Sequence, residues 1–144
     1  MKSLKIQTDV LKLMVKELNY VWCEGENDTI GIGDGYCLVF IPKDEMFLKP
    51  DRDPFNIGKF LESFHRDDYK LASKTILKEN GGKRCWKLET KNGKFAWFNE
   101  QYTKYFDKDA RYYVLSPRSA ILVVEGEWDL VGLVMPVIGT EWGF

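Results

Sequence analysis

Residues 95–106 read FAWFNEQYTKYF, and residues 4–15, 91 positions earlier, follow the same order of residue types as LKIQTDVLKLMV. In both stretches a strand-like alternation comes first and is followed by the spacing of one apolar helix face. Thr8 and Asn99 stand between the two patterns, where a side-chain oxygen can cap the first helical turn. Each stretch therefore predicts a strand followed by a helix. The buried face predicted for the first helix consists of Leu11, Met14, Val15 and Leu18.

Both stretches lead into further segments that have the character of strands. In the first half, apolar segments bounded by turn residues predict strands at 29–33, 36–41 and 46–48, and Asp34-Gly35 predicts a tight hairpin turn between the first two. In the second half they predict strands at 111–115, 120–125 and 130–137. We therefore expect an α+β fold in which residues 1–137 form one domain. That domain is expected to contain a doubled β-α-β-β-β unit, with halves at about 1–50 and 84–137.

An additional helical segment is predicted between the halves, at about 53–74. Asp53-Pro54 is typical of a helix start. The aspartate can cap the helix, and proline is suited to the first helical position because the N–H of that position has no partner within the helix. Apolar residues at helical spacing follow it, namely Ile57, Phe60, Leu61 and Phe64. Further along, Asn92-Gly93 predicts a tight hairpin turn between strands at 85–90 and 95–98.

The composition sets limits on the class of protein. The chain has 144 residues, of which 44% are apolar, as expected for one globular domain. Cys23, Cys37 and Cys85 are far apart and there is one histidine, so we expect neither a disulfide framework nor a metal site. The opening residues do not resemble a secretory leader, and no segment reaches the roughly 18 apolar residues that a membrane span needs. We therefore expect a cytoplasmic protein that has no membrane contact, metal or cofactor.

The C-terminal part carries a resemblance to a known family. Residues 116–124 read SPRSAILVV and residues 130–137 read LVGLVMPV, two apolar segments joined by a turn and closed by Met-Pro. With the doubled unit and the opening segment 1–18, they resemble one domain of the bacterial DNA polymerase sliding clamp. In that family a terminal motif with Met-Pro helps line the groove where polymerase and other partners insert a short peptide. The resemblance implies a similar groove here, lined by Met135, Pro136 and Val137.

The resemblance implies a non-enzymatic, clamp-like protein-binding module, linked to DNA replication and of a size that suits a phage or mobile element. It covers the two ends of the chain, whereas the family has no counterpart of the helical segment 53–74 or of residues 138–144. A clamp ring contains six such domains. A one-domain chain would therefore have to form a homo-oligomer of six copies to encircle DNA.

The tail 138–144 is a second candidate site for a protein partner. It contains Trp142 and Phe144, which are separated by one glycine. Aromatic side chains beside a terminal carboxylate can dock in a groove on a partner. They can equally fold back and cover apolar surface of their own domain. Both interpretations stay open.

A basic segment suggests an alternative function in nucleic-acid binding. Residues 65–94 carry nine Lys or Arg against four acids, whereas residues 24–53 carry eight acids against three bases. Lysines can bind phosphates and a tryptophan can stack on a base, although exposed lysines also protect sheet edges from aggregation. In this alternative DNA is a partner. The contacting residues would be Lys83, Arg84, Trp86, Lys87, Lys91 and Lys94.

A metal-dependent nuclease is the remaining alternative. Pro50-Asp51 and Glu89-Thr90-Lys91 are similar to nuclease elements in which carboxylates hold a divalent metal and a lysine activates water. However, Glu89-Thr90-Lys91 runs into a predicted hairpin turn, and such short matches are frequent. We therefore assign no catalytic residue and expect a binding protein.

Overall fold

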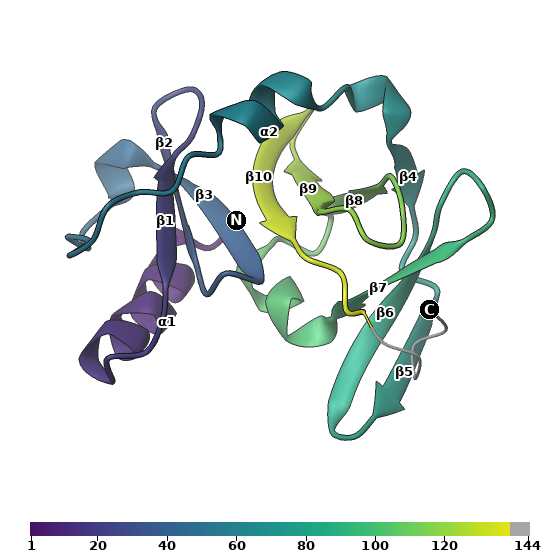
Figure 1. The fold of residues 1–144 in the computed structure, drawn as a ribbon, viewed down its shortest axis with the longest axis horizontal. Helices are drawn as coiled ribbons and strands as arrows, with labels where there is room; N and C mark the ends of the chain where they lie inside the picture. Colours follow the sequence, from purple (N-terminus) through teal and green to yellow (C-terminus); the bar gives the residue numbers. More distant parts are fainter. Residues whose placement is uncertain (139–144) are drawn as a thin grey trace.

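The structure is a computed structural model that describes residues 1–138, apart from the side chains of residues 62, 63 and 80. The described residues form an α+β fold, as the sequence predicts, and their strands are arranged in two antiparallel sheets. Figure 1 shows helix α1 (Ser3–Val15) beside one end of the larger sheet and the smaller sheet at the opposite end of the molecule. None of the helices in this part of the chain is long and apolar enough to cross a membrane.

The larger sheet has seven strands in the order β1-β2-β3-β10-β9-β8-β4. The first three form a meander: β1 (Val21–Glu24), β2 (Thr29–Gly33) and β3 (Cys37–Pro42). The others are β4 (Lys70–Ala72), β8 (Arg111–Val114), β9 (Ile121–Glu125) and β10 (Asp129–Val134). The predicted turn at Asp34-Gly35 joins β2 to β3, and Gly35 has the positive φ of 95° that such a turn favours.

The smaller sheet contains β5 (Ile76–Asn80), β6 (Lys83–Glu89) and β7 (Phe95–Asn99) in chain order. The hairpin predicted around Asn92-Gly93 is confirmed, since β6 pairs with β7 and Gly93 has a φ of 72°. A 3-10 helix, η3 (Glu100–Tyr105), follows β7 directly. Asn99 caps it as predicted, because its side-chain oxygen accepts a hydrogen bond from the amide of Gln101 at 3.1 Å.

A helical segment followed by a three-strand meander occurs twice. Strands β1, β2 and β3 begin at residues 21, 29 and 37, and β8, β9 and β10 begin 90, 92 and 92 positions later. The two meanders meet where β3 pairs antiparallel with β10, so the strand order is mirrored on either side of that pair. The displacement of 91 residues seen in the sequence is therefore present in the sheet.

The prediction of a strand at the start of the chain is wrong. Residues 4 and 6 already lie inside α1, so the first half lacks the opening strand of a β-α-β-β-β unit. Ile6 and Val10 pack on the sheet at helical spacing, and this burial outweighs the strand-like alternation of Leu4 and Ile6. Thr8 does not cap the helix, because its hydroxyl donates to the carbonyl oxygen of Leu4 at 2.8 Å.

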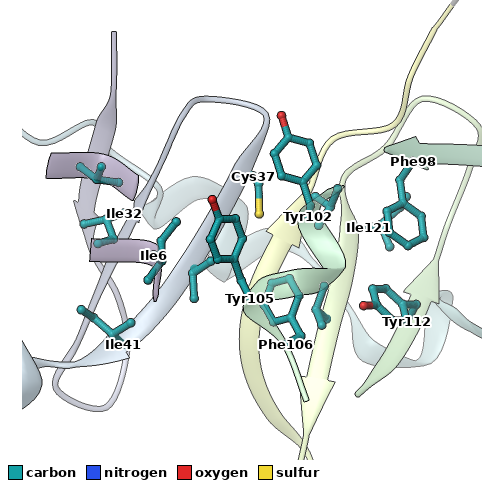
Figure 2. Close-up of a cluster of buried hydrophobic side chains, with 14 of the residues drawn as sticks. Ile6, Ile32, Cys37, Ile41, Phe98, Tyr102, Tyr105, Phe106, Tyr112 and Ile121 are labelled. Carbon is teal, nitrogen blue, oxygen red and sulfur yellow. The ribbon is translucent and has the colours of Figure 1, made fainter. Parts of the chain in front are cut away.

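The main core lies between one face of the larger sheet and the elements α1, η3 and the smaller sheet. Figure 2 shows aromatic residues of the η3 region between the isoleucines of the first half and the side chains of the second half. These aromatic residues are Tyr102, Tyr105 and Phe106. The two halves therefore share a single apolar core.

The segment between the halves covers the other face of the larger sheet. Its helix α2 is only Gly58–Ser63 and is followed by the 3-10 turn η2 (Arg66–Asp68) and by β4. The predicted helix at 53–74 is thus shorter than expected. Ile57 and Tyr69 are buried against this face together with Leu38, Phe40, Leu122 and Leu133. The predicted strand at 46–48 is also absent, since this segment follows the 3-10 turn η1 (Lys43–Glu45) and runs along α1.

Candidate functional site

Helix α1 is fixed to the molecule by its inner face. Ile6 and Val10 are buried in the main core, and Gln7 is buried beside them. The Gln7 side chain donates to the carbonyl oxygen of Glu45 at 2.9 Å and accepts from the amides of Phe47 and Leu48 at 2.8 and 3.2 Å. These three bonds hold the 45–48 segment against one side of the helix.

The outer face of α1 is also apolar, and it is exposed to solvent. The exposed fractions are 69% for Leu4, 43% for Leu11, 76% for Val15 and, just past the helix end, 51% for Leu18. These four residues form what we call the apolar stripe. Leu4, Leu11 and Val15 lie along one line of the helix, because they are separated by seven and four residues, and Leu18 is exposed just past the helix end. Phe47, which Gln7 holds beside the helix, is exposed by 51% next to this stripe.

The buried face predicted for this helix is wrong at three of its four positions. Leu11, Val15 and Leu18 are exposed, and only Met14 packs partly against the main core. The helix carries apolar residues on two faces, and helical spacing alone cannot say which face meets the sheet. The sequence does contain a signal of the exposed surface, namely a second line of apolar residues on the helix. A helix that is buried on one side needs only one such line.

Lysines flank the apolar stripe on the side away from the 45–48 segment. Lys5 and Lys12 lie one position after Leu4 and Leu11, and Lys16 follows Val15. Asp9 is the neighbouring acid and is already engaged, since it lies 3.9 Å from the amino group of Lys5 and 3.5 Å from that of Lys104. No acid among the described residues forms an ion pair with Lys12 or Lys16. The flank is therefore positively charged.

The charge of Asp9 is maintained by its neighbours. Burial alone would raise the Asp9 pKa, but the hydrogen bond from Tyr105 and the charges of Lys104 and Lys5 outweigh it. The pKa therefore lies below its ordinary value of 3.8. The Tyr105 hydroxyl donates to Asp9 at 2.7 Å, and burial together with this bond raises the pKa of Tyr105. Asp9 is thus an anion at neutral pH that joins α1 to η3.

A hollow of about 250 Å³ lies between α1 and η3, lined by Asp9, Lys12, Asp34, Cys37 and Lys104 among others. Asp34 accepts hydrogen bonds from the Tyr102 hydroxyl at 2.9 Å and from the amides of Tyr36 and Cys37 at 2.8 and 3.0 Å. Burial raises the pKa of the Cys37 thiol, and so does the charge of Asp34. Cys37 is therefore a protonated core thiol and a poor nucleophile.

A second hollow, of about 360 Å³, lies on the opposite face of the larger sheet. Its apolar walls include Phe40, Leu61, Phe64 and Trp128. The Trp128 indole N–H is the one buried side-chain polar group of the described residues that has no hydrogen-bond partner. The guanidinium of Arg66 lies 4.5 Å from the centre of the Trp128 ring and covers one of its faces.

Met135, Pro136 and Val137, the residues expected to line a peptide groove, form a bridge between the two sheets. The Met135 amide donates to the carbonyl of Tyr36 at 2.8 Å, and the Val137 amide donates to the carbonyl of Trp97 at 2.7 Å. Pro136 is buried, Val137 packs against Cys85 and Trp97, and Met135 remains exposed. Trp142 and Phe144 lie outside the described residues, so their role stays a prediction.

The basic residues proposed for nucleic-acid binding are distributed over both faces of the smaller sheet. Lys87 lies 3.6 Å from the Phe95 ring centre, whereas Arg84 pairs with Glu100 at 3.3 Å. Trp86 is half-buried against the main core. The amino group of Lys91, in the β6–β7 turn with Lys94, donates to the carbonyl of Asp67 at 2.5 Å, and Lys83 is exposed at the start of β6. One outer face therefore presents lysines beside an aromatic ring.

The two elements of the nuclease alternative lie in different parts of the fold. Asp51 follows the 45–48 segment and accepts a hydrogen bond from the Tyr20 hydroxyl, whereas Glu89 ends β6 in the smaller sheet. Within the described part of the chain, no three His, Cys, Asp or Glu side chains gather in a way that could hold a metal ion. The geometry lends this alternative no support.

Comparison with known proteins gives no match of any kind. No protein-family model, no curated protein and no solved structure is significantly similar to this chain.

Proposed function

We propose that this chain is a non-enzymatic protein-binding module and that the apolar stripe of α1 is its contact surface. One observation carries this proposal: Leu4, Leu11 and Val15 lie exposed along one line of α1, and Leu18 is exposed just past its end. Isolated exposed apolar residues are common on soluble proteins, but an aligned set on one element is typical of a surface that a partner covers. When a partner covers leucine and valine side chains in such a position, their removal from water lowers the free energy of the complex.

The stripe is presented on a helix that is already ordered. Gln7 ties α1 to the 45–48 segment, and the Tyr105–Asp9 hydrogen bond ties it to η3. The amide of Lys2 also donates to the carbonyl of Tyr105 at 2.8 Å. A surface that is rigid before binding loses little conformational entropy when a partner docks. These contacts support a preformed docking surface.

A link to DNA replication, or to a phage or mobile element, remains part of this proposal through the resemblance to sliding clamps. The cytoplasmic location and assembly into several copies belong to the same proposal. Met135 and Ile138 add exposed apolar surface near the end of the described chain, where a second protein contact could form.

Selection of binding peptides tests this function. A random peptide library is selected on the purified chain, and the enriched clones are then measured on the double variant L11E/V15E. Both side chains are exposed, so the variant is expected to fold normally, which circular dichroism checks. We expect affinity to fall by about tenfold or more, because two charges would be buried at the contact.

The matched control is Leu71→Glu, which changes a similarly exposed leucine on β4. Peptides that contact the stripe should bind this variant as they bind the original chain. The proposal is wrong if the enriched peptides bind L11E/V15E and the original chain equally well. It is also wrong if the library yields no binder above background.

Nucleic-acid binding by the smaller sheet is the second candidate function. It is favoured by the seven Lys or Arg against two acids in residues 74–94 and by the amino group of Lys87 over the Phe95 ring. If this function holds, affinity for single-stranded DNA should fall steeply as salt rises and should be lost in K83E/K87E. L11E/V15E should retain it. Binding that is independent of salt would contradict this candidate.

A further inference from the structure

We infer that the partner of the apolar stripe is an amphipathic helix that carries acidic residues along the flank facing Lys5 and Lys12. This inference rests on the proposed function, and it adds the shape and the charge of the partner. Both follow from the positions that the exposed residues occupy on α1.

The shape of the stripe is that of a helix–helix seam. Leu4 and Leu11 are seven residues apart on α1, and Thr8 and Val15 each follow one of them by four residues. This places leucine at one core position of a heptad and β-branched residues at the other, a pattern that favours two-stranded helix pairing. The Thr8 hydroxyl is satisfied within the helix by the carbonyl of Leu4, so it adds no unpaired polar group to the seam.

The width of the stripe argues against a lipid surface. A helix that lies in a membrane interface buries a broad apolar face, whereas the exposed apolar surface here is limited to the stripe and to Phe47 beside it. It is limited by Lys5 and Lys12 on one side and by Gln7, which is bonded to the 45–48 segment, on the other. A single partner helix fits between these limits.

The charge of the flank requires acids on the partner. Lys5 and Lys12 occupy the heptad positions that face the flank of a docked helix, where opposite charges set partner choice. Lys104 adds a third positive charge close by, and Asp9 is the acid that lies among them. The surplus is positive, so glutamate or aspartate on the partner is favoured at low and moderate salt.

A second copy of the chain does not supply these acids. In an antiparallel pair of α1 helices, Lys5 and Lys12 would face the same lysines of the other copy. In a parallel pair they would face Gln7 and Met14, which are neutral and already packed against their own chain. Neither arrangement gives the lysines an opposite charge, so self-pairing through this surface is disfavoured.

Two designed peptides test the inference. Both form amphipathic helices with the same leucine and valine seam, but one carries glutamate and the other lysine at the flanking positions. Binding to the full chain is measured by fluorescence anisotropy at two salt concentrations. We expect the glutamate peptide to bind at least about tenfold more tightly at low salt, and we expect the difference to shrink as salt rises.

Charge reversal on the chain provides the decisive control. In K5E/K12E the preference should invert, so that the lysine peptide binds more tightly. The charge-matched variant K83E/K94E changes two exposed lysines on the smaller sheet and should leave the preference unchanged. Equal affinity of both peptides for the original chain, with binding still lost in L11E/V15E, would overturn the acidic partner but leave the proposed function standing.

Three other results would overturn the inference by naming a different occupant or none. Light scattering that shows a dimer lost in L11E/V15E would identify a second copy. Binding to anionic vesicles that is lost in the same variant would identify a lipid surface. If neither designed peptide binds and the library also yields no stripe-dependent binder, both the inference and the proposed function fail.

Discussion

Gly132 in β10 occupies a position in the main core that has no room for a side chain. A Cβ atom at this position would lie 2.4 Å from Cζ of Phe106 and 2.9 Å from the carbonyl oxygen of Leu38. Phe106 can therefore pack directly on the sheet only because residue 132 has no side chain. The contact joins the end of η3 to the strand at the centre of the larger sheet.

We predict that Gly132→Ala destabilises the protein by about 1–3 kcal/mol, since overpacking forces Phe106 or the strand to move. Urea unfolding followed by tryptophan fluorescence measures this. Gly58→Ala is the control, because its Cβ would meet only the side-chain oxygen of Asn56 at 3.0 Å and alanine favours a helix. Equal stabilities of the two variants would show that the core adapts to the added methyl group.

Asp9 provides a prediction about pH. Its pKa is below 3.8 in the folded protein, so it stabilises the fold fully above about pH 4. That contribution is lost as the pH falls through the lowered pKa. In Tyr105→Phe the pKa of Asp9 should rise, because the hydrogen bond from the hydroxyl is removed. NMR titration of the Asp9 carboxyl carbon measures the change.

Tyr102→Phe is the matched control for this titration, since the Tyr102 hydroxyl donates to Asp34 and not to Asp9. It should leave the pKa of Asp9 where it is. An Asp9 pKa that is the same in Tyr105→Phe and in the original chain would mean that the lysines alone keep the carboxylate charged.

At the scale of elements, the end of α1 shows how the chain leaves the helix. The amide of Leu18 donates to the carbonyl of Leu13 at 2.9 Å, and that of Glu17 donates to the carbonyl of Met14 at 3.1 Å. This is a Schellman motif, which places the residue before Leu18 in the left-handed region. Glu17 occupies that position with a φ of 58°, where glycine is the usual residue.

We predict that Glu17→Gly stabilises the protein by about 0.5–1 kcal/mol, because glycine avoids the steric cost of left-handed backbone. Thermal unfolding by calorimetry checks it. Glu17→Ala keeps the strain while removing the charge and should not stabilise the fold. A gain of the same size from alanine would assign the effect to charge and not to backbone conformation.

The tight turns and most strands of the larger sheet were predictable from the sequence, whereas the helical character of residues 3–7 and the short length of α2 were not. Asn92-Gly93 and Asp34-Gly35 indicated their hairpins because tight turns need a residue with positive φ. The first four residues of the α1 pattern fit a strand as well as a helix, and packing on the sheet decided between them. The same limit applies to the candidate site, because which apolar face of α1 is exposed depends on packing against β2, β3 and η3, which are about 20 positions or more away in sequence.

At the scale of the whole molecule, the repeat seen in the sequence corresponds to a real division of the larger sheet. Residue types displaced by 91 positions predicted two similar halves, and the strand starts confirm the displacement for all three strands of the meander. The sequence did not predict that the halves meet at β3 and β10, since a pairing between distant strands leaves no local signal.

The three cysteines lie in three separate apolar clusters of the molecule. Cys37 is in the main core, Cys23 is beneath the segment that contains α2, and Cys85 is beneath Val137. Burial raises the pKa of Cys23 to about 11 and also raises that of Cys85. Since the thiolate is the reactive form, none should react quickly in the native state at pH 8.

We predict that Cys85 is alkylated before Cys23 and Cys37, because the bridge 135–137 can open without unfolding the larger sheet. Peptide mass spectrometry after timed exposure to iodoacetamide measures the order. Val137→Ala should accelerate alkylation of Cys85 alone. Simultaneous modification of all three thiols would show that the molecule opens only as one cooperative unit.

The position of β10 between β3 and β9 has a consequence for synthesis of the chain. Val39 pairs with Gly132, so 93 residues must be translated before β3 obtains its second neighbour. At ribosomal rates of roughly 5–20 residues per second, this interval lasts about 5–20 s. During that time β3, whose residues 37–41 are all buried in the finished fold, has an open edge on the nascent chain. Neighbouring nascent chains on the same messenger could pair through this edge. The risk of aggregation is therefore greatest before β10 is synthesised.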